Sequence, residues 1–247
     1  MEDLKGKAAL VTGGSSGIGK AVAKRLAEEG CNLVLVARDE KKLKKVKRSI
    51  KQDHPETNIS TAPTDIRDED QVKDMVKICL NNMGRLDILV NNAGIIRYGE
   101  LENFSTKDFH DVMETNVYGT FYATKAALPH LKESKGNLIF IGSFDANHPR
   151  SFNPIYSSSK WWVKGFAHSV ESIVGKQGVA VTLINPSEVR TDIPDEEGKA
   201  YKNKFDQGEV TEPNEIADTV VFAAKQSKTT TLSQIDIYRR DKLSDFF

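Results

Sequence analysis

Residues 7–36 read KAALVTGGSSGIGKAVAKRLAEEGCNLVLV and indicate a β-strand, a glycine-rich turn, an α-helix and a second β-strand. The runs at 7–12 and 32–36 are short and apolar with β-branched residues, as is typical of buried strands. Between them, residues 17–29 carry apolar side chains at helical spacing. Two strands joined through a helix pair in parallel, because a parallel partner cannot be reached by a tight hairpin. This stretch therefore predicts the start of an α/β sheet.

The same alternation continues along the chain. Strands are expected at 58–62, 86–90, 137–141, 179–184 and 234–237, and helices at 39–52, 68–83, 105–133, 155–176 and 213–226. This order is typical of a three-layer, doubly wound (Rossmann-like) α/β fold with a parallel sheet of about seven strands. An eight-unit barrel has the same alternation but needs one more strand. Residues 1–247 are expected to form a single domain.

Two segments interrupt this alternation. Residues 144–153 separate a strand from the next helix, and residues 187–210 form a polar stretch that contains Pro194 and Gly198. Ligands bind at loops of this kind in doubly wound sheets. Both segments are expected to shape a substrate pocket, the second as a mobile lid. The alternative for 187–210 is a surface insertion without a role.

Composition favours a small molecule as the partner. The 35 basic and 35 acidic side chains balance, so overall charge gives no reason to expect nucleic acid or a membrane surface. The basic run 41–51 is interpreted as the solvated face of a helix. Residues 1–7 lack the apolar core of a signal peptide, and no apolar run of about 18 residues occurs. Because Cys31 and Cys79 form no C-x-x-C pair and the histidines form no cluster, we expect a cytoplasmic protein without a metal.

The turn TGGSSGIG at 12–19 favours a nucleotide ligand. Glycines let the backbone approach a pyrophosphate, and the N-terminus of the following helix offers N–H groups to the anion. The spacing G-x-x-x-G-x-G differs from the general G-x-G-x-x-G fingerprint, and glycine-rich turns also occur as plain connections. The flanking strand and helix favour the nucleotide-binding interpretation.

The end of the second strand, VARD at 36–39, bears on the choice of cofactor. An acidic residue there binds the adenosine 2′-hydroxyl of NAD, whereas an arginine accommodates the 2′-phosphate of NADP. Arg38 therefore favours NADP(H), because a guanidinium group fits phosphate. Asp39 is open to two interpretations, the acid of an NAD site or an ordinary helix N-cap.

Tyr156 and Lys160 lie four residues apart in a predicted helix and share one of its faces. The lysine ammonium would stabilise the phenolate and lower the tyrosine pKa from its ordinary value of about 10. Such a pair alone is common on helix surfaces. Ser143 at the end of the fifth strand and Asn116 in the preceding long helix can converge with it at the carboxyl edge of the sheet. Together the four side chains predict an acid–base site.

These motifs follow one another in a fixed order along nearly the whole chain. They are T-G-G-S-S-G-I-G at 12–19, N-N-A-G at 91–94, Asn116, Ser143, Y-x-x-x-K at 156–160 and P-x-x-V-x-T at 186–191. In this order the sequence resembles the short-chain dehydrogenase/reductase family. The resemblance implies a nicotinamide cofactor, a catalytic tetrad of Asn116, Ser143, Tyr156 and Lys160, and assembly as a homodimer or homotetramer.

The resemblance also implies the residues that contact the cofactor. Asp65 and Ile66 are expected to border the adenine, and residues 92–94 to line the cofactor channel. The full expected set is Gly13, Ser15, Ser16, Gly17, Ile18, Gly19, Arg38, Asp65, Ile66, Asn92, Ala93, Gly94, Tyr156, Lys160, Pro186, Val189 and Thr191.

In the implied reaction, the nicotinamide delivers hydride to a carbonyl carbon while Tyr156 gives its proton to the oxygen. Ser143 would hold that oxygen, Lys160 would bind the ribose and acidify the tyrosine, and Asn116 would hold a water of a proton relay. The expected function is thus NADP(H)-dependent interconversion of a carbonyl compound and an alcohol. The alternatives are a non-catalytic NADPH-binding sensor or interaction protein, and a sugar-nucleotide epimerase or dehydratase, which needs a further substrate domain.

The chain departs from the family pattern at two places. Ser187 and Glu188 follow the proline at 186, where the family usually has glycine next. The tail at 229–247 lacks the paired glycines that end many 3-oxoacyl reductases. This weakens a fatty-acid assignment and makes the tail more similar to the branch with 3-hydroxy acid, serine and sepiapterin-type dehydrogenases.

Further side chains are open to two interpretations. A cationic rim for an anionic substrate would be formed by Arg97, His148 and Arg150. The alternative is that these three side chains are simply exposed to solvent. Trp161 and Trp162 follow the lysine on its helix, where the family often pairs its subunits. We expect one to be buried and the other to cap a subunit interface, with core packing of both as the alternative.

Overall fold

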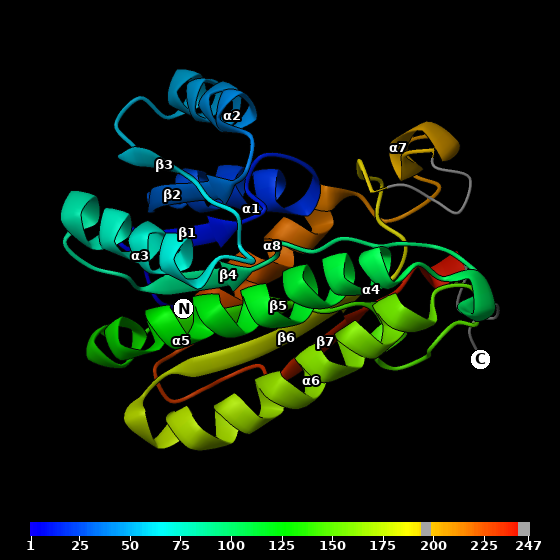
Figure 1. Cartoon of the computed structure of the whole chain (residues 1–247). Helices are drawn as coiled ribbons and strands as arrows, with labels where there is room; N and C mark the ends of the chain where they lie inside the picture. The colour runs from blue at the N-terminus through cyan, green and yellow to red at the C-terminus, as the bar shows by residue number, and fades with distance from the viewer. Residues whose placement is uncertain (194–198, 242–247) are drawn as a thin grey trace.

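A seven-stranded parallel sheet lies between two layers of helices (Figure 1) in the computed structural model, which describes residues 1–193 and 199–241. The strand order is β3-β2-β1-β4-β5-β6-β7, and every neighbouring pair is parallel. This confirms the expected fold class. The strands are β1 (Ala8–Thr12), β2 (Asn32–Ala37), β3 (Ile59–Pro63), β4 (Ile88–Asn91), β5 (Asn137–Ile141), β6 (Ala180–Pro186) and β7 (Gln234–Ile237).

The helices also lie where the apolar periodicity predicts them, with one difference. The expected helix at 105–133 contains a π-helical turn, η2 (Glu114–Tyr118), between two α-helical parts. The short helix α7 lies inside the segment 187–210, of which residues 194–198 fall outside the described residues. The α-helices are α1 (Gly17–Glu28), α2 (Glu40–Asp53), α3 (Glu69–Met83), α4 (Thr106–Met113), α5 (Gly119–Ser134), α6 (Pro154–Val174), α7 (Tyr201–Lys204) and α8 (Pro213–Ala224).

Two apolar cores hold the layers together, one on each face of the sheet. Side chains along a strand point alternately to opposite faces. Ala9 and Val11 of β1 accordingly join the core formed with α1, α2 and α8. Ala8 and Leu10 join the core formed with α3, α5 and α6. The inner strands are buried on both faces, which is why their sequences read as continuous apolar runs.

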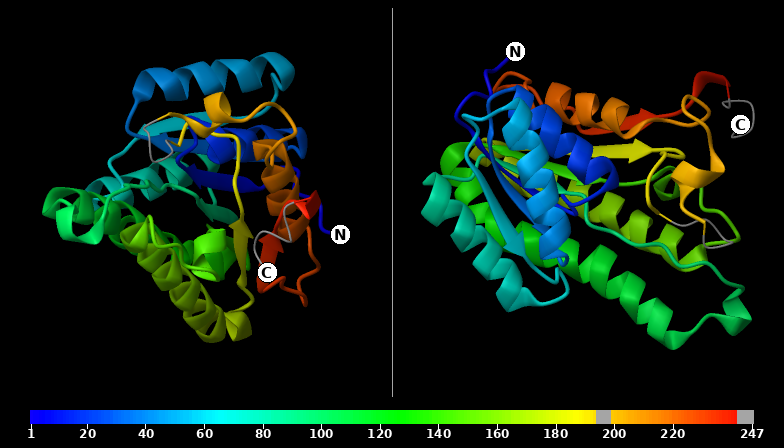
Figure 2. Two further views of the ribbon diagram at one scale, coloured as in Figure 1. Left: turned by 90° about the vertical axis from the view of Figure 1, so that its right-hand side faces the viewer. Right: turned by 90° about the horizontal axis from the view of Figure 1, so that it is seen from above.

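The chain reverses its direction of winding beside β1. It proceeds from β1 to β2 and β3 on one side and then returns to place β4 on the other side. In open parallel sheets, ligands bind at the carboxyl ends of the strands at such a switch point. Figures 1 and 2 show α7 at this same edge. A parallel bridge between Val189 and Thr211 ties the two ends of the segment around α7 together.

Candidate active site

The turn between β1 and α1 requires glycine at three positions, Gly13, Gly17 and Gly19. Gly13 and Gly17 have φ of +67° and +50°, in the left-handed region that favours glycine. A Cβ atom on Gly13 would lie 2.6 Å from Nδ2 of Asn92, and one on Gly19 would lie 2.4 Å from the carbonyl oxygen of Gly13. Ser16, the N-cap of α1, makes no side-chain capping bond, so its hydroxyl does not occupy the first N–H groups of the helix. The turn thus combines close backbone approach with the N–H donors that suit a phosphate.

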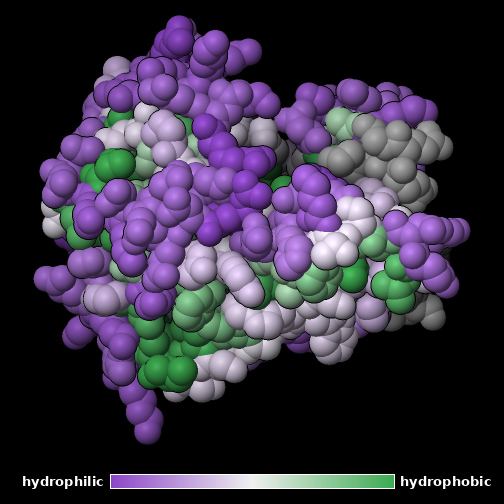
Figure 3. All heavy atoms as spheres, in the orientation of Figure 1, coloured by the Kyte–Doolittle hydropathy of each residue, from purple (hydrophilic) through white to green (hydrophobic). Residues whose placement is uncertain are grey.

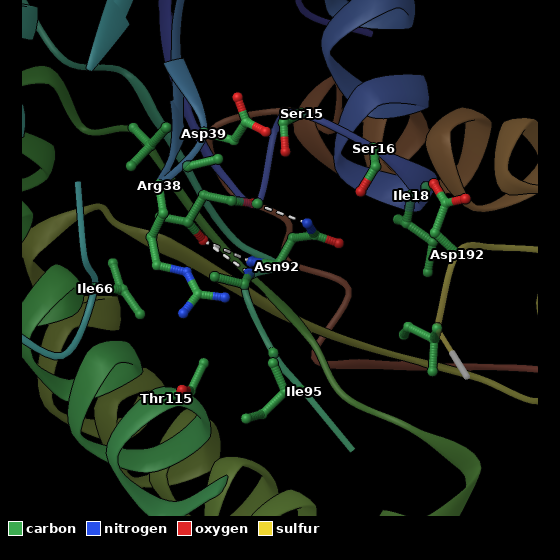
Figure 4. A pocket seen from close by; sticks show the side chains of 18 of the residues that line it. Ser15, Ser16, Ile18, Arg38, Asp39, Ile66, Asn92, Ile95, Thr115 and Asp192 are labelled. Carbon is green, nitrogen blue, oxygen red and sulfur yellow. Dashed lines mark hydrogen bonds between the residues drawn. The ribbon is translucent and has the colours of Figure 1, made fainter. Parts of the chain in front are cut away.

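A cleft of about 420 Å³ extends from this turn along the carboxyl edge of the sheet (Figure 4). It adjoins a smaller cavity of about 100 Å³ that contains Tyr156. The expected cofactor residues that line the cleft are Gly13, Ser15, Ser16, Gly17, Ile18, Arg38, Asp65, Ile66, Asn92, Ala93, Gly94 and Thr191. Those that line only the smaller cavity are Tyr156, Lys160, Pro186 and Val189.

Gly19 lines neither cavity and instead packs behind the turn. The sequence did not single out Lys42, Thr64, Ile95, Thr115 and Asp192, which also line the cleft. Lys42 belongs to the basic run 41–51, so a signal for it was present. The others are neighbours in the chain of residues that had been singled out.

Asn92 joins the ends of β1 and β4 at the floor of the cleft. Its Nδ2 donates to the carbonyl oxygen of Thr12 at 2.8 Å, and the backbone N–H groups of Asn92 and Ala93 donate to the Thr12 hydroxyl at 2.9 and 3.0 Å (Figure 4). These bonds hold the two strand ends together at the switch point. They also explain why Gly13 and Gly19 must lack side chains beside Asn92.

Arg38 and Asp39 have different surroundings at the end of β2. The Asp39 carboxylate accepts a hydrogen bond from the backbone N–H of Lys42 at 3.0 Å and caps α2. Asp39 is therefore a helix N-cap, which was one of its two interpretations. Figure 4 shows the Arg38 side chain extending into the cleft between Ile66 and Asn92. This end of the cleft thus presents a guanidinium group to a ligand.

Asp65, expected near the adenine, is held by a neighbouring arginine. Nε and Nη2 of Arg67 donate to the two carboxylate oxygens of Asp65 at 2.9 and 2.6 Å. This pairing lowers the pKa of Asp65 below its ordinary value. Arg67 also bonds to Asp111 at 3.2 Å, and this connects the end of β3 to α4.

Tyr156 and Lys160 project from α6 into the smaller cavity, as their spacing predicts. The Lys160 ammonium lies 5.7 Å from the centre of the tyrosine ring and donates to the carbonyl oxygen of Ile141 at 2.9 Å. Burial lowers the pKa of Lys160 to about 8. Burial, followed by the negative charge of Asp145, raises the pKa of the Tyr156 phenol above its ordinary value. This direction differs from the expected lowering of the tyrosine pKa, because desolvation and the Asp145 carboxylate outweigh the hydrogen bond with Ser143 and the charge of Arg150.

Asn116 occupies the middle of the π-helical turn. Such turns are frequent at functional sites, because the extra residue per turn redirects a side chain. Oδ1 of Asn116 accepts from the N–H of Ile95 at 2.8 Å, while Nδ2 donates to the Ile95 carbonyl oxygen and to the Ser159 hydroxyl at 2.9 and 3.0 Å. The Asn116 amide thus fastens the chain beyond β4 to the start of α6, beside Gly94.

Ser143 lies at the end of β5, where its hydroxyl is bonded to a residue that the sequence did not single out. Oγ of Ser143 donates to Asp145 at 2.9 Å. The fully buried Asp145 carboxylate also accepts two bonds from Arg150, at 2.9 and 2.8 Å. Arg150 in turn donates to Glu188 at 3.2 Å. An acidic residue two positions after Ser143 was the available signal, but its pairing depends on loops that meet only in the fold.

The structure shows the surroundings of the basic side chains and the two tryptophans that the sequence left open to two interpretations. Arg150 lines the smaller cavity, and Arg97 lines the cleft and pairs with Asp108 at 3.1 Å. His148 stacks on Phe144, with 4.7 Å between the ring centres. Trp162 stacks on Phe166 at 4.6 Å, whereas Trp161 is 47% exposed. One tryptophan therefore joins the apolar packing and the other lies at the surface.

Sequence comparison places the chain in a known family. The family model for short chain dehydrogenases matches residues 7–202. The chain belongs to this family. Its similarity to an uncharacterized oxidoreductase of Staphylococcus aureus is 34% identity over 238 residues, which cover 96% of this chain and 99% of that protein.

Solved structures agree with the family assignment. An alcohol dehydrogenase from the archaeon Thermococcus sibiricus, complexed with 5-hydroxy-NADP, has a TM-score of 0.86 and 27% identity, covering 94% of this chain and 96% of its own. A short chain dehydrogenase from Mycobacterium paratuberculosis bound to NAD has a TM-score of 0.84 and 28% identity, covering 96% and 97%. This short-chain dehydrogenase is accordingly an oxidoreductase of a family whose members bind nicotinamide dinucleotides. Because these relatives bind either NADP or NAD, the cofactor preference of this chain has to be argued from the residues of its own cleft.

Two further observations concern the described part of this short-chain dehydrogenase. No helix within residues 1–193 and 199–241 combines the length and the apolar character needed to cross a bilayer. The same residues contain no group of three histidine, cysteine, aspartate or glutamate side chains placed to hold a metal ion.

Proposed function

We propose that this short-chain dehydrogenase uses NADP(H) to interconvert a carbonyl compound and the corresponding alcohol, with Tyr156 as the general acid and base. One observation carries the proposal. Tyr156, Ser143 and Lys160 meet in a small cavity that opens beside the nucleotide-sized cleft. A substrate in that cavity lies within reach of both the phenol and the reactive end of a cofactor in the cleft.

The residues of the cleft fit a dinucleotide phosphate. The backbone N–H groups at the start of α1 and the absence of side chains at Gly13 and Gly17 suit a pyrophosphate. Arg38 and Lys42 at the far end suit a 2′-phosphate, since a guanidinium group forms charge-assisted bonds to phosphate oxygens. Asp39 uses one carboxylate oxygen to cap α2 and also lines the cleft, so the case for a 2′-phosphate rests on Arg38 and Lys42. These features support NADP(H) over NAD(H).

The bound nicotinamide supplies or accepts the hydride. Tyr156 is protonated at neutral pH, because burial raises the pKa of its phenol, so it can give a proton to a carbonyl oxygen. Because burial lowers the pKa of Lys160 to about 8, its ammonium can give up a proton near neutral pH and restore the proton of Tyr156. Asn116 would hold a water of that proton relay, and Ser143 would contact the reacting oxygen.

The surface supports assembly into a homodimer or homotetramer. Trp161 on α6 and Phe121 on α5 are 47% and 40% exposed. Figure 3 shows apolar side chains gathered on the face that α5 and α6 form. Exposed aromatic residues are enriched where subunits meet, and a second copy would cover this face.

The proposed function is tested by nucleotide oxidation with a panel of ketones and aldehydes. We expect NADPH to be oxidised with at least one class of carbonyl compound, and kcat/KM to be higher with NADPH than with NADH. A higher kcat/KM with NADH would contradict the assigned role of Arg38. Tight NADPH binding without turnover across the panel would instead favour a sensor that binds the nucleotide without catalysis.

A further inference from the structure

The cavity that holds Tyr156 has charged side chains beside the catalytic groups. Asp145, Arg150 and Glu188 line it together with Ser143. Both oxygens of Asp145 bond to Arg150, and Arg150 donates to Oε1 of Glu188. Arg150 is therefore not a free cation that could receive a carboxylate.

Asp145 and Glu188 are balanced in the same cavity by Arg150 and Lys160, and the Lys160 ammonium donates to the Ile141 carbonyl oxygen. Because both basic groups already have partners, neither is free to receive an anionic substrate.

Glu188 retains unused hydrogen-bonding capacity. Its Oε2 atom is buried and has no hydrogen-bond partner among the residues that the structure describes. Next to it, the buried hydroxyl of Ser187 likewise lacks a partner within that part of the chain. A buried carboxylate oxygen left without a donor is costly, so a donor group that enters the cavity gains by binding there. Both residues occupy the place where the chain departs from the usual family pattern after Pro186.

The remaining wall combines two tyrosines with aliphatic side chains, among them Ile96, Ile141 and Ile193. Tyr98 and Tyr201 line the cavity with their hydroxyl groups 3.5 Å apart, and Tyr98 stacks on Phe152 with 6.1 Å between the ring centres. The tyrosine hydroxyl groups give a polar substituent further hydrogen-bond partners, and the small volume of the cavity suits a small ligand.

We propose that the substrate is a small carbonyl compound that carries a hydrogen-bond donor, a hydroxyl or an ammonium group, next to the carbonyl, and that lacks a carboxylate or phosphate. Glu188 is the residue that selects for this donor. This inference rests on the proposed function, because it describes the substrate of the same site.

The test uses four ketones that share the acetyl group and differ in its substituent. Hydroxyacetone and aminoacetone carry donors, pyruvate carries a carboxylate, and 2-butanone carries an ethyl group. With NADPH, we expect kcat/KM for at least one of the two donor compounds to exceed that for 2-butanone and pyruvate by on the order of 10- to 100-fold. The ratio of hydroxyacetone to aminoacetone distinguishes a neutral donor from a cationic one.

Substitution of Glu188 separates its effect from the intrinsic reactivity of the ketones. In Glu188→Leu the preference for donor compounds over 2-butanone should fall by about tenfold or more. In Glu188→Gln, which keeps an acceptor oxygen and the side-chain size, the preference for hydroxyacetone should fall less than in Glu188→Leu. The control is Glu209→Gln, an exposed carboxylate that lines neither cavity, and thermal unfolding checks that each variant is folded.

The following results would overturn the inference. A wild-type kcat/KM for pyruvate or 2-butanone that equals the value for the donor compounds contradicts the substrate class. It leaves the proposed function intact. An unchanged preference in folded Glu188→Leu contradicts the role of Glu188. If none of the four ketones is reduced while another carbonyl compound of the wider panel is, the substrate class is wrong and the proposed function stands. If no compound of the wider panel is reduced either, the proposed function is at fault, and calorimetric titration of the NADPH complex then decides the substrate class by itself. Binding of hydroxyacetone or aminoacetone without binding of pyruvate supports it, and any other pattern overturns it.

Discussion

Neighbouring residues at the end of β2 have separate tasks. Asp39 caps α2 through the N–H of Lys42, while the exposed Arg38 extends into the cleft. The sequence predicts the role of Arg38 directly, because an arginine at this strand end suits a 2′-phosphate. It leaves Asp39 open, because an N-cap and a ribose ligand require the same residue type at nearly the same position.

Replacement of Arg38 should change the choice of nucleotide. In Arg38→Leu we expect the KM for NADPH to rise on the order of 10- to 100-fold, because a charge-assisted bond to phosphate is lost. The KM for NADH should change little. The matched control is Arg48→Leu on α2, whose guanidinium does not line the cleft. Equal effects on both nucleotides in Arg38→Leu would contradict the assignment.

Asp145 should act on the reaction through Tyr156. Its negative charge raises the pKa of the phenol, so Asp145→Asn lowers that pKa. Alcohol oxidation needs the deprotonated phenol and rises with pH, so its rising limb should move to lower pH. The measurement is the pH profile of kcat for the wild type, Asp145→Asn and the control Asp236→Asn on β7. A lower kcat with an unshifted profile would indicate a purely structural role.

Helix α5 and the segment before it illustrate what periodicity predicts at the scale of an element. The apolar spacing indicates one helix over 105–133, and the structure has helix throughout most of this range. The π-helical turn Glu114–Tyr118 is not predicted, because a single extra residue hardly changes the apolar pattern. Yet this turn is what places Asn116 against Ile95.

The glycine turn allows a matched test at the same scale. A methyl group on Gly19 would collide with the backbone of Gly13, whereas nothing lies within 4 Å of one on Gly165 in α6. Gly19→Ala should lower the free energy of unfolding by about 1–3 kcal/mol and weaken NADPH binding. Gly165→Ala should raise the free energy of unfolding by about 0.4–1 kcal/mol, because alanine favours a helix. Chemical denaturation measures both, and equal effects of the two substitutions would contradict the steric argument.

The whole molecule is largely predictable from its sequence, for a physical reason. Inner parallel strands are buried on both faces, so they appear as apolar runs, and all seven lie within two residues of their predicted bounds. Resemblance to a family supplies the expected site residues. The ion network of Asp145, Arg150 and Glu188 is not predictable in this way, because it joins two loops and depends on their three-dimensional path.

The face formed by α5 and α6 should decide the oligomeric state. Trp161→Glu places a charge on the exposed apolar surface, so we expect a dimer or tetramer to dissociate into smaller species. Light scattering after size-exclusion chromatography measures the mass. The control is Leu101→Glu, which is also exposed but lies outside this face. A mass unchanged by Trp161→Glu would exclude this face as the contact.

Removal of the Tyr156 hydroxyl is the most direct test of the account. Tyr156→Phe keeps the ring and removes the proton donor, and Tyr122→Phe on α5 is the control. We expect kcat for NADPH-dependent reduction to fall on the order of 10²–10⁴-fold in Tyr156→Phe while the Kd for NADPH stays the same. Full turnover by folded Tyr156→Phe protein would contradict the account.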